Sequence, residues 1–185
     1  KIMTNKNNIE LVKEGFANGV VPGGPLSEQE RQQMIQNAAY AFGNFLDALG
    51  CHWEEDPNSD NTPMRVAKAY VNDLWAGRYE GAPDITAFPS DGYDGMVFEG
   101  GIPLTSMCSH HHQTILGKVH VAYIPHTIIN DNCGVAVMIE ATHNCVQCRG
   151  VKHGGASMKT SKLTKAFKND PATRNEFYEF IRGYN

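Results

Sequence analysis

The stretch that decides the fold is "MCSHHHQTILGKVHVAYIP", residues 107 to 125, in which a turn rich in cysteine and histidine leads into a regularly alternating segment. Val119 and Val121 fall on one face of that segment, and Lys118 and His120 fall on the other. This two-residue alternation is typical of a β-strand with two unlike faces. The neighbouring segments "MVFEG", "IPLTS" and "GVAVMIEATHNCVQCRGV" also have strand character, so the second half of the chain predicts a mainly antiparallel sheet.

A helix is predicted upstream of the sheet. Ser27 and Glu30 have the spacing of a capping box, which marks a helix start, and Gly50 is a typical helix stop. The apolar residues between these signals recur at three- and four-residue spacing and are expected to form one buried face. They are Met34, Ala38, Ala41, Phe42, Phe45 and Leu49.

Two further helices have clear starts. Thr62 is placed as an N-cap with Pro63 at the first helical position, and Asp170 with Pro171 repeats the arrangement near the end of the chain. Helices at both ends of an antiparallel sheet predict an α+β fold. The expected buried positions are Val66, Ala69, Tyr70 and Leu74 in the first of these helices, and Phe177 and Ile181 in the second.

The length of the chain suits one domain. We expect residues 27–185 to form it, with helices over 27–80 and the sheet and its helices over 81–185. Residues 1–26 end in "GVVPGGPL", a Gly/Pro connector, and are expected to be a flexible N-terminal arm.

Composition narrows the class of protein. The net charge of −4 gives no reason to expect nucleic acid or an acidic membrane as a partner. No apolar run approaches the roughly 20 residues that span a bilayer, and the start lacks the apolar region of a secretory signal. Five cysteines at irregular spacing make a poor disulfide framework. We therefore expect a cytoplasmic protein whose Cys/His clusters bind metal.

Two clusters could supply metal ligands. Cys108-x-x-His111 has a common zinc-ligand spacing, because one turn can present both side chains to an ion. The second cluster, "HNCVQCRG", holds His143, Cys145 and Cys148. If it continues a strand, His143 and Cys145 share a face and Cys148 points away. Cys145 would then complete a trio with Cys108 and His111.

Two zinc sites remain open on these residues. A structural site would take four protein ligands by adding Cys148, whereas a catalytic site would take three and leave one position for water. The catalytic alternative is favoured because "MIEATHNCVQC" has no Gly or Pro for a zinc-knuckle turn. His110 and His143 are in addition placed to act as acid–base groups.

Basic residues hint at a phosphate-bearing substrate. Arg149 follows the second cluster, and Arg65 and Lys68 lie three residues apart on one helix. Guanidinium groups suit phosphate oxygens, and Lys acts as a point charge. The alternative for Arg65 and Lys68 is an ordinary solvated surface.

Four motifs in order resemble the type I GTP cyclohydrolase family over roughly residues 27 to 185. They are "NTPMRVAKAYV", "LTSMCSHHHQTILGKVHVAYIP", "HNCVQCRGV" and "DPATRNEFYEFIR". The resemblance implies the T-fold, in which small sheets associate into a barrel-shaped homo-oligomer, commonly a decamer.

The resemblance also implies an activity: zinc-dependent hydrolytic opening of the imidazole ring of GTP, giving 7,8-dihydroneopterin triphosphate and formate. Folate, biopterin and deazapurine synthesis all begin with this pterin-forming step. By resemblance, Zn²⁺ would be held by Cys108, His111 and Cys145, and the acid–base histidines would be His110 and His143. The triphosphate would be bound by Arg149, Arg65 and Lys68.

One departure from the family follows Pro125. There the family has a loop and a long helix that carry guanine- and phosphate-binding residues, whereas this chain has only "HTIINDNCGVAV". We expect the molecule to carry a disordered segment near residues 125–127 that this sequence lacks. The alternative is a true deletion, which would remove guanine recognition.

Two other functions compete with the leading one. The first is another T-fold enzyme that acts on a purine or pterin through a cysteine nucleophile. The second is a non-catalytic interaction module stapled by zinc at Cys108, His111, Cys145 and Cys148.

Overall fold

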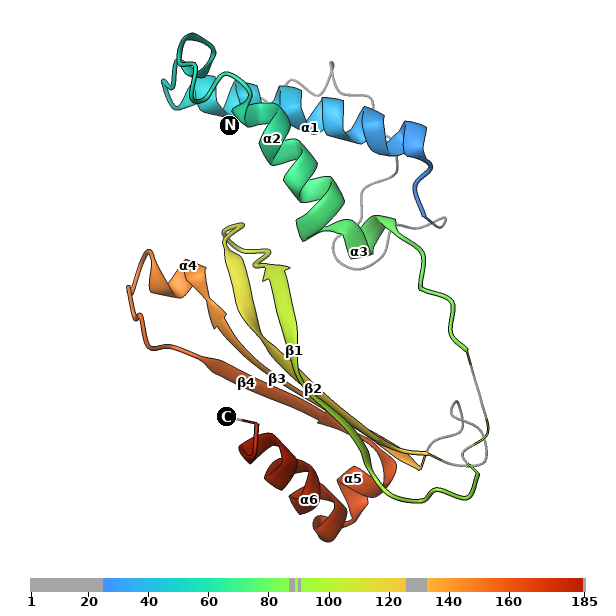
Figure 1. Ribbon diagram of the computed structural model, residues 1–185. Coiled ribbons are helices and arrows are strands. Elements are labelled where there is room, and N and C mark those ends of the chain that lie inside the picture. The colour runs from blue at the N-terminus through green and yellow to red at the C-terminus, as the bar shows by residue number, and fades with distance from the viewer. Residues whose placement is uncertain (1–24, 87–88, 90, 126–132, 185) are drawn as a thin grey trace. The chain divides into compact units, whose positions relative to one another are not determined.

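The computed structural model describes residues 25–86, 89, 91–125 and 133–184 (Figure 1). The chain divides into two compact units, Lys1–Pro83 and Asp84–Asn185, and each is described by itself. Most of the expected N-terminal arm, and residues 126 and 127 of the expected disordered segment, lie outside the described residues.

Helix α1 (Glu28–Ala48) opens the first unit with the predicted capping box. The Glu30 backbone N–H donates to Ser27 Oγ at 3.3 Å, and the Ser27 N–H donates to Glu30 Oε2 at 2.9 Å. Gly50 follows the helix with φ +75°, a left-handed conformation that suits glycine. Both predicted boundaries of this helix are confirmed.

The buried face of α1 is only in part the predicted one, because Met34 and Ala38 are half-buried and pack against the core. Phe45 and Leu49 are 54% and 62% exposed, so their assignment to the core was wrong. Small residues let α1 approach its neighbours instead: a Cβ on Gly43 would lie 3.1 Å from Trp53 Cζ2. A helix with apolar residues on several sides does not reveal by spacing alone which side is covered. The buried residues of α1 are Ile35, Ala39 and Gly43.

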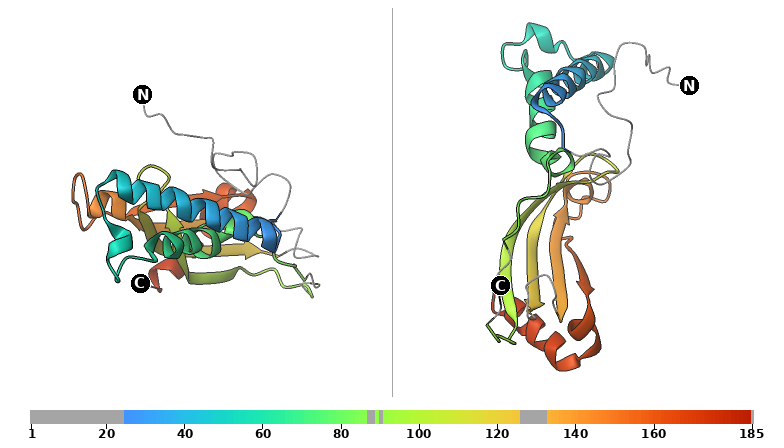
Figure 2. Two further views of the ribbon diagram at one scale, coloured as in Figure 1. Left: turned by 90° about the horizontal axis from the view of Figure 1, so that it is seen from above. Right: turned by 90° about the vertical axis from the view of Figure 1, so that its right-hand side faces the viewer.

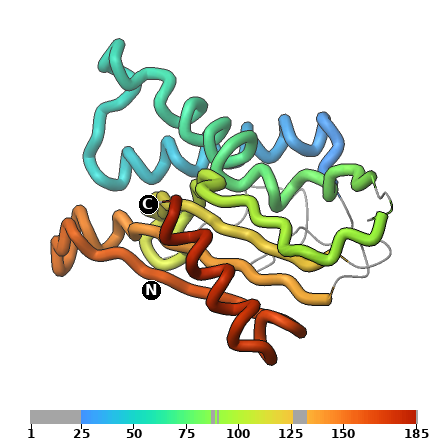
Figure 3. The backbone as a smooth tube through the Cα atoms, turned by 60° about the horizontal axis from the view of Figure 1, so that its bottom comes forward, coloured from blue at the N-terminus to red at the C-terminus, as the bar shows by residue number. Residues whose placement is uncertain are grey.

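Helix α2 (Thr62–Ala69) packs along α1, as the tube in Figure 3 shows. Its N-cap is Asn61 instead of Thr62, one residue before the predicted position. The buried positions follow a four-residue spacing, and the predicted set is only half-buried. They are Pro63 and Ala67, then Val71 in the π-helical segment η3 (Tyr70–Leu74).

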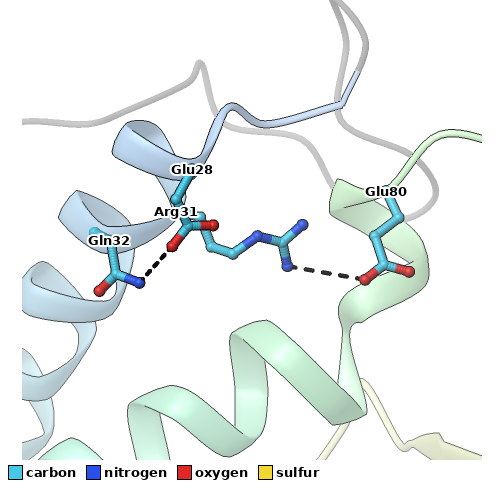
Figure 4. Close-up of polar contacts among 4 residues, drawn as sticks. All are labelled: Glu28, Arg31, Gln32 and Glu80. Atoms are coloured by element: carbon cyan, nitrogen blue, oxygen red, sulfur yellow. Dashed lines mark hydrogen bonds and ion pairs between the residues drawn. The ribbon is translucent and has the colours of Figure 1, made fainter.

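Contacts between the two ends of the first unit close it. The Leu26 N–H donates to the Tyr79 carbonyl at 2.9 Å, at the end of α3 (Ala76–Tyr79). The half-buried Arg31 pairs with Glu80 at 3.9 Å (Figure 4). The start of α1 is therefore tied to the end of the unit through both backbone and side chain.

The second unit is a four-stranded antiparallel sheet in the order β1-β2-β3-β4. "MVFEG" and "IPLTS" form one strand, which bends at a bulge between Glu99 and Ile102 where Gly101 has φ +71°. The strands are β1 (Val97–Met107), β2 (Thr114–Ile124), β3 (Gly134–His143) and β4 (Met158–Leu163).

Helices α5 (Lys165–Asn169) and α6 (Pro171–Arg182) cover one face of the sheet (Figure 2). Asp170 caps α6 as predicted, with side-chain oxygens that accept from the N–H groups of Ala172 and Thr173. The core that forms between sheet and helices contains Ala122, Ala136, Phe167, Phe177 and Ile181.

The predicted alternation in β2 is present, and the helices cover the side that carries His120 and Ala122. Val119 and Val121 on the other side stay half-buried. Alternation defines two faces of a strand, and only the packing of α5 and α6 decides which face is the core. Together with the helices, the sheet makes this an α+β protein. Among the described residues, no helix is both long and apolar enough to cross a membrane.

Candidate metal centre and active site

The turn between β1 and β2 presents Cys108. The Cys108 N–H donates to the Gln113 carbonyl, and the His112 N–H donates to the Cys108 carbonyl, both at 2.9 Å. His112 has φ +49°, so the chain passes through a left-handed residue to close the turn. The turn lies at the same end of the sheet as helix α4 (Asn144–Gln147) in Figure 1.

The segment after β3 is not the predicted continuous strand. Strand β3 ends at His143, and the chain then forms α4, whose end is closed by the Cys148 N–H donating to the Asn144 carbonyl at 2.9 Å. The expectation that the strand continues through Cys145 and Cys148 was therefore wrong. The sequence lacks the Gly or Pro of a knuckle turn, but a helical turn needs neither.

The two clusters meet in space. The Cys145 thiol donates a hydrogen bond to Cys108 Sγ across 3.5 Å. Ligand atoms of Cys108, His143 and Cys145 all lie within 4.8 Å of one another, and within the described ranges this is the group that could hold a metal ion. Cys108 is only 4% exposed, whereas His143 and Cys145 are half-buried.

The surroundings of Cys108 favour its thiolate. The His110 backbone N–H and the His110 ring, whose Nδ1 lies 3.6 Å from Cys108 Sγ, lower the pKa of the Cys108 thiol from 9.0 to about 6. The hydrogen bond to the Cys108 sulfur raises the pKa of Cys145. Without a metal, one negative charge is therefore carried mainly by Cys108, and Cys145 keeps its proton.

His111 and Cys148 stand outside the group of three. The exposed ring of His111 has its centroid 6.4 Å from that of His110. The Cys148 thiol instead donates to the Asn144 carbonyl at 2.8 Å.

The predicted phosphate-binding residues lie in different units. Arg149 follows α4 in the second unit and is exposed, and its charge favours the thiolate of Cys145. Arg65 and Lys68 are exposed on α2 in the first unit, where Arg65 Nη1 donates to the Asn58 carbonyl at 3.4 Å.

One contact at the centre could not be predicted from the sequence. The Asn144 side-chain amide donates to Thr114 Oγ1, a residue 30 positions away, and so links α4 to the first residue of β2. No local pattern marks either residue, because the pair forms only through the β2–β3 register.

Comparison with known proteins assigns the chain to a family. The model of the family described as GTP cyclohydrolase I matches residues 38–130 and 127–182. The chain is 35% identical to GTP cyclohydrolase 1 of Aliivibrio fischeri (strain MJ11), over 93% of this chain and 94% of that protein. It is 33% identical to the Pseudoalteromonas translucida protein of the same name, over 77% and 96%, and 30% identical to that of Rattus norvegicus, over 86% and 80%. The chain belongs to the GTP cyclohydrolase I family, which is a family of enzymes.

The same comparisons locate a departure from the relatives. The alignment with the Aliivibrio fischeri protein spans 209 positions, more than the 185 residues of this chain, so that protein has residues with no counterpart here. The family model matches as two segments that meet at residues 127–130. This is the region in which the sequence departs from the family pattern.

The chemistry of the three side chains fits a zinc ion. Two sulfurs and an imidazole are the soft and borderline donors that Zn²⁺ takes in proteins. Because one of the two thiols is already poised to ionise near neutral pH, few protons have to be displaced when a cation binds.

Proposed function

We propose that this chain catalyses the zinc-dependent hydrolytic opening of the imidazole ring of GTP, which gives 7,8-dihydroneopterin triphosphate and formate. The observation that carries the proposal is the meeting of Cys108, Cys145 and His143 within 4.8 Å in a chain of the GTP cyclohydrolase I family. These residues would hold a zinc ion, which would supply a nucleophile by lowering the pKa of water towards about 7.

The proposed ligands are Cys108, Cys145 and His111. His111 belongs to the same tight turn as Cys108, so rotation of an exposed side chain suffices to change its distance from the sulfurs. His143 is nearer to the sulfurs in the present geometry and is the alternative third ligand. Assigning His111 to the metal leaves His143 free to transfer a proton.

The proposed acid–base residues are His110 and His143. His110 contacts the Cys108 sulfur through Nδ1, which fixes the orientation of the ring beside the centre. One of the two residues must give a proton to the ring nitrogen that leaves when the imidazole opens, and the other must take one from the attacking oxygen. Two imidazoles at one site can supply both functions.

The proposed triphosphate ligands are Arg149, Arg65 and Lys68. Arg149 is exposed. It lies close to the centre in sequence, because it follows the α4 turn that carries Cys145. Arg65 and Lys68 belong to the other unit and reach the triphosphate in this proposal from their own or a neighbouring subunit. A triphosphate needs several cations, because each phosphate oxygen removed from water must find a partner.

We also propose a homo-oligomer, a barrel of T-fold sheets such as a decamer. Within the described sheet, β1 and β4 are edge strands with one side unpaired, and edges of this kind join antiparallel sheets of neighbouring copies. A reducing, cytoplasmic setting agrees with five free cysteines.

The decisive experiment measures formate release and the pterin absorbance when the full chain and Zn²⁺ are mixed with GTP. Turnover that is lost in Cys145→Ser and His143→Ala supports the proposal. Zinc bound tightly without turnover would instead identify a zinc-stapled interaction module. That outcome is the second candidate because the relatives contain residues that this chain lacks. Turnover by the metal-free protein would indicate a cysteine nucleophile.

A further inference from the structure

We propose that Asn144 and Thr114 are positioning residues for the metal centre, and that the hydrogen bond between their side chains holds the sulfur of Cys145 against that of Cys108. The inference rests on the proposed function in one respect, because it assigns the two sulfurs to a metal ion. It adds residues that do not touch the metal themselves.

The geometry of the bond places it between the two sulfur-bearing segments. Asn144 Nδ2 donates to Thr114 Oγ1 at 2.5 Å, and both side chains are half-buried. Asn144 directly precedes Cys145 in the chain. Thr114 pairs across β1–β2 with Met107, the residue directly before Cys108. One side-chain bond therefore connects the residue directly before Cys145 with the cross-strand partner of the residue directly before Cys108.

The backbone does not make this connection. The β2–β3 ladder ends at the pair Ile115 and His143, and beyond it the chain turns into α4. The backbone ladder between β2 and β3 thus ends one residue before Asn144. The side chain of Asn144 spans the position where the next backbone hydrogen bond would lie, so the orientation of α4 depends on a side-chain contact.

Each end of this bond is fixed to its own turn. The Asn144 carbonyl accepts from both the N–H and the thiol of Cys148, at 2.9 and 2.8 Å, which closes α4. On the other side, the Gln113 carbonyl accepts from the Cys108 N–H at 2.9 Å, which closes the turn that precedes Thr114. Since both turns are internally bonded, the link between them sets the separation of the sulfurs.

The chain offers a matched control. Thr142 also lies on the β2–β3 ladder and also makes one hydroxyl bond across it, to the Leu116 carbonyl at 3.2 Å. That bond stabilises the same pair of strands but connects neither sulfur-bearing turn. Thr142→Val therefore removes a comparable hydroxyl without changing the centre, and Thr114→Ser keeps the oxygen that Thr114→Val removes.

The first measurement is zinc affinity, obtained with the full chain by competition against a chromophoric chelator. Loss of a contact that orients a metal ligand typically weakens binding about 10- to 100-fold, and we expect that loss for Thr114→Val and for Asn144→Ala. Thr114→Ser is expected to recover most of it, and Thr142→Val is expected to bind zinc as the unchanged protein does. Equal losses in the two valine variants, or no loss in either, would overturn the inference.

The second measurement needs neither zinc nor turnover. In the metal-free protein, diamide accepts two electrons and two protons from a pair of thiols and leaves a disulfide, and peptide mapping follows the Cys108–Cys145 product. We expect this cross-link to form more slowly in Thr114→Val than in Thr142→Val, at urea concentrations where both are folded. Equal rates of cross-linking in the two variants would overturn the inference. In the first measurement, a full chain that binds no zinc would also overturn it.

The two proposals fail separately. If the order of zinc affinities holds but the unchanged protein releases no formate from GTP, the proposed function is wrong and the positioning role stands. If the unchanged protein turns over GTP and Thr114→Val binds zinc equally well, the positioning role is wrong and the function stands.

Discussion

The Cys145 thiol donates a hydrogen bond to the sulfur of Cys108 across 3.5 Å, although the two residues lie 37 positions apart in the chain. The two pKa shifts agree with this direction, because the hydrogen bond contributes to lowering the pKa of Cys108 and is the largest cause that raises the pKa of Cys145. One of the two sulfurs is therefore already in the form that binds metal, because the thiolate and not the thiol is the metal ligand.

The first prediction concerns the ionisation of Cys108 in chelator-treated protein. Since its pKa is about 6, well below 9.0, the thiolate should persist as the pH falls until it is protonated near pH 6. Thiolate absorbance in the ultraviolet, measured as the difference from Cys108→Ser, should therefore show a midpoint near that pH. His110→Ala should move the midpoint upward, because it removes the contact of the His110 ring, the second-largest cause of the lowered pKa, and keeps the backbone N–H contact. A midpoint near that of an ordinary thiol in the unchanged protein would contradict the geometry.

The second prediction separates the two candidate imidazole ligands. His111→Ala should lose bound zinc, whereas His143→Ala should keep zinc and lose turnover by about 10²- to 10⁴-fold, the usual contribution of a general acid or base. Metal content by atomic absorption and formate release provide the two readouts. The opposite pattern would identify His143 as the ligand and His111 as the residue that the metal does not need.

The third prediction concerns the buried His120, whose ring is 1% exposed and accepts the Gly101 N–H at Nδ1. Burial lowers the pKa of His120 below 6.5; Lys118 and Lys159 lower it further, and Glu140 opposes them. The unfolded chain therefore binds a proton at a higher pH than the folded one does. The free energy of unfolding should fall as the pH drops through 6.5 towards the folded pKa.

Urea unfolding at pH 7.5 and 5.5 measures this dependence. His120→Gln, which keeps a hydrogen-bond acceptor but does not titrate, should show a smaller difference between the two pH values. The prediction is refuted by a variant whose stability responds to pH as strongly as that of the unchanged protein.

The fourth prediction tests the close approach of β2 and β3. A Cβ on Gly117 would collide with the Glu140 carbonyl and lie 2.7 Å from Ala141 Cα. Gly117→Ala should destabilise the protein by about 1–3 kcal/mol, the usual cost of overpacking. Gly154→Ala is the control, because a Cβ there meets nothing within 4 Å. Urea unfolding of both variants gives the comparison, and equal midpoints would show that the strands separate without cost.

A fifth prediction concerns the departure from the relatives near residues 127–130. If the molecule carries an additional disordered segment there, its intact mass must exceed the 20.4 kDa of this sequence. A measured mass of 20.4 kDa would establish a true deletion. The protein should then bind zinc but release no formate from GTP.

Helix boundaries could be predicted from the sequence where a capping residue forms hydrogen bonds within a few positions of itself. The capping box at Ser27 and Glu30 and the Asp170-Pro171 start of α6 are confirmed, because hydrogen bonds over a few residues decide them. Burial was harder to predict. Phe45 and Leu49 continue an apolar spacing, but Ile35, Ala39 and Gly43 form the face that α2 covers.

The sequence by itself determined the α+β class, the alternation of β2, the family and the two Cys/His clusters, because each depends on residue type and short-range spacing. Only the tertiary structure decided that β3 ends at His143, that Cys145 lies on a helical turn, and that Asn144 reaches Thr114. The Asn144–Thr114 and Cys145–Cys108 contacts join residues 30 and 37 positions apart. They exist because the register of β2 and β3 brings the ends of distant strands together, which no local pattern encodes.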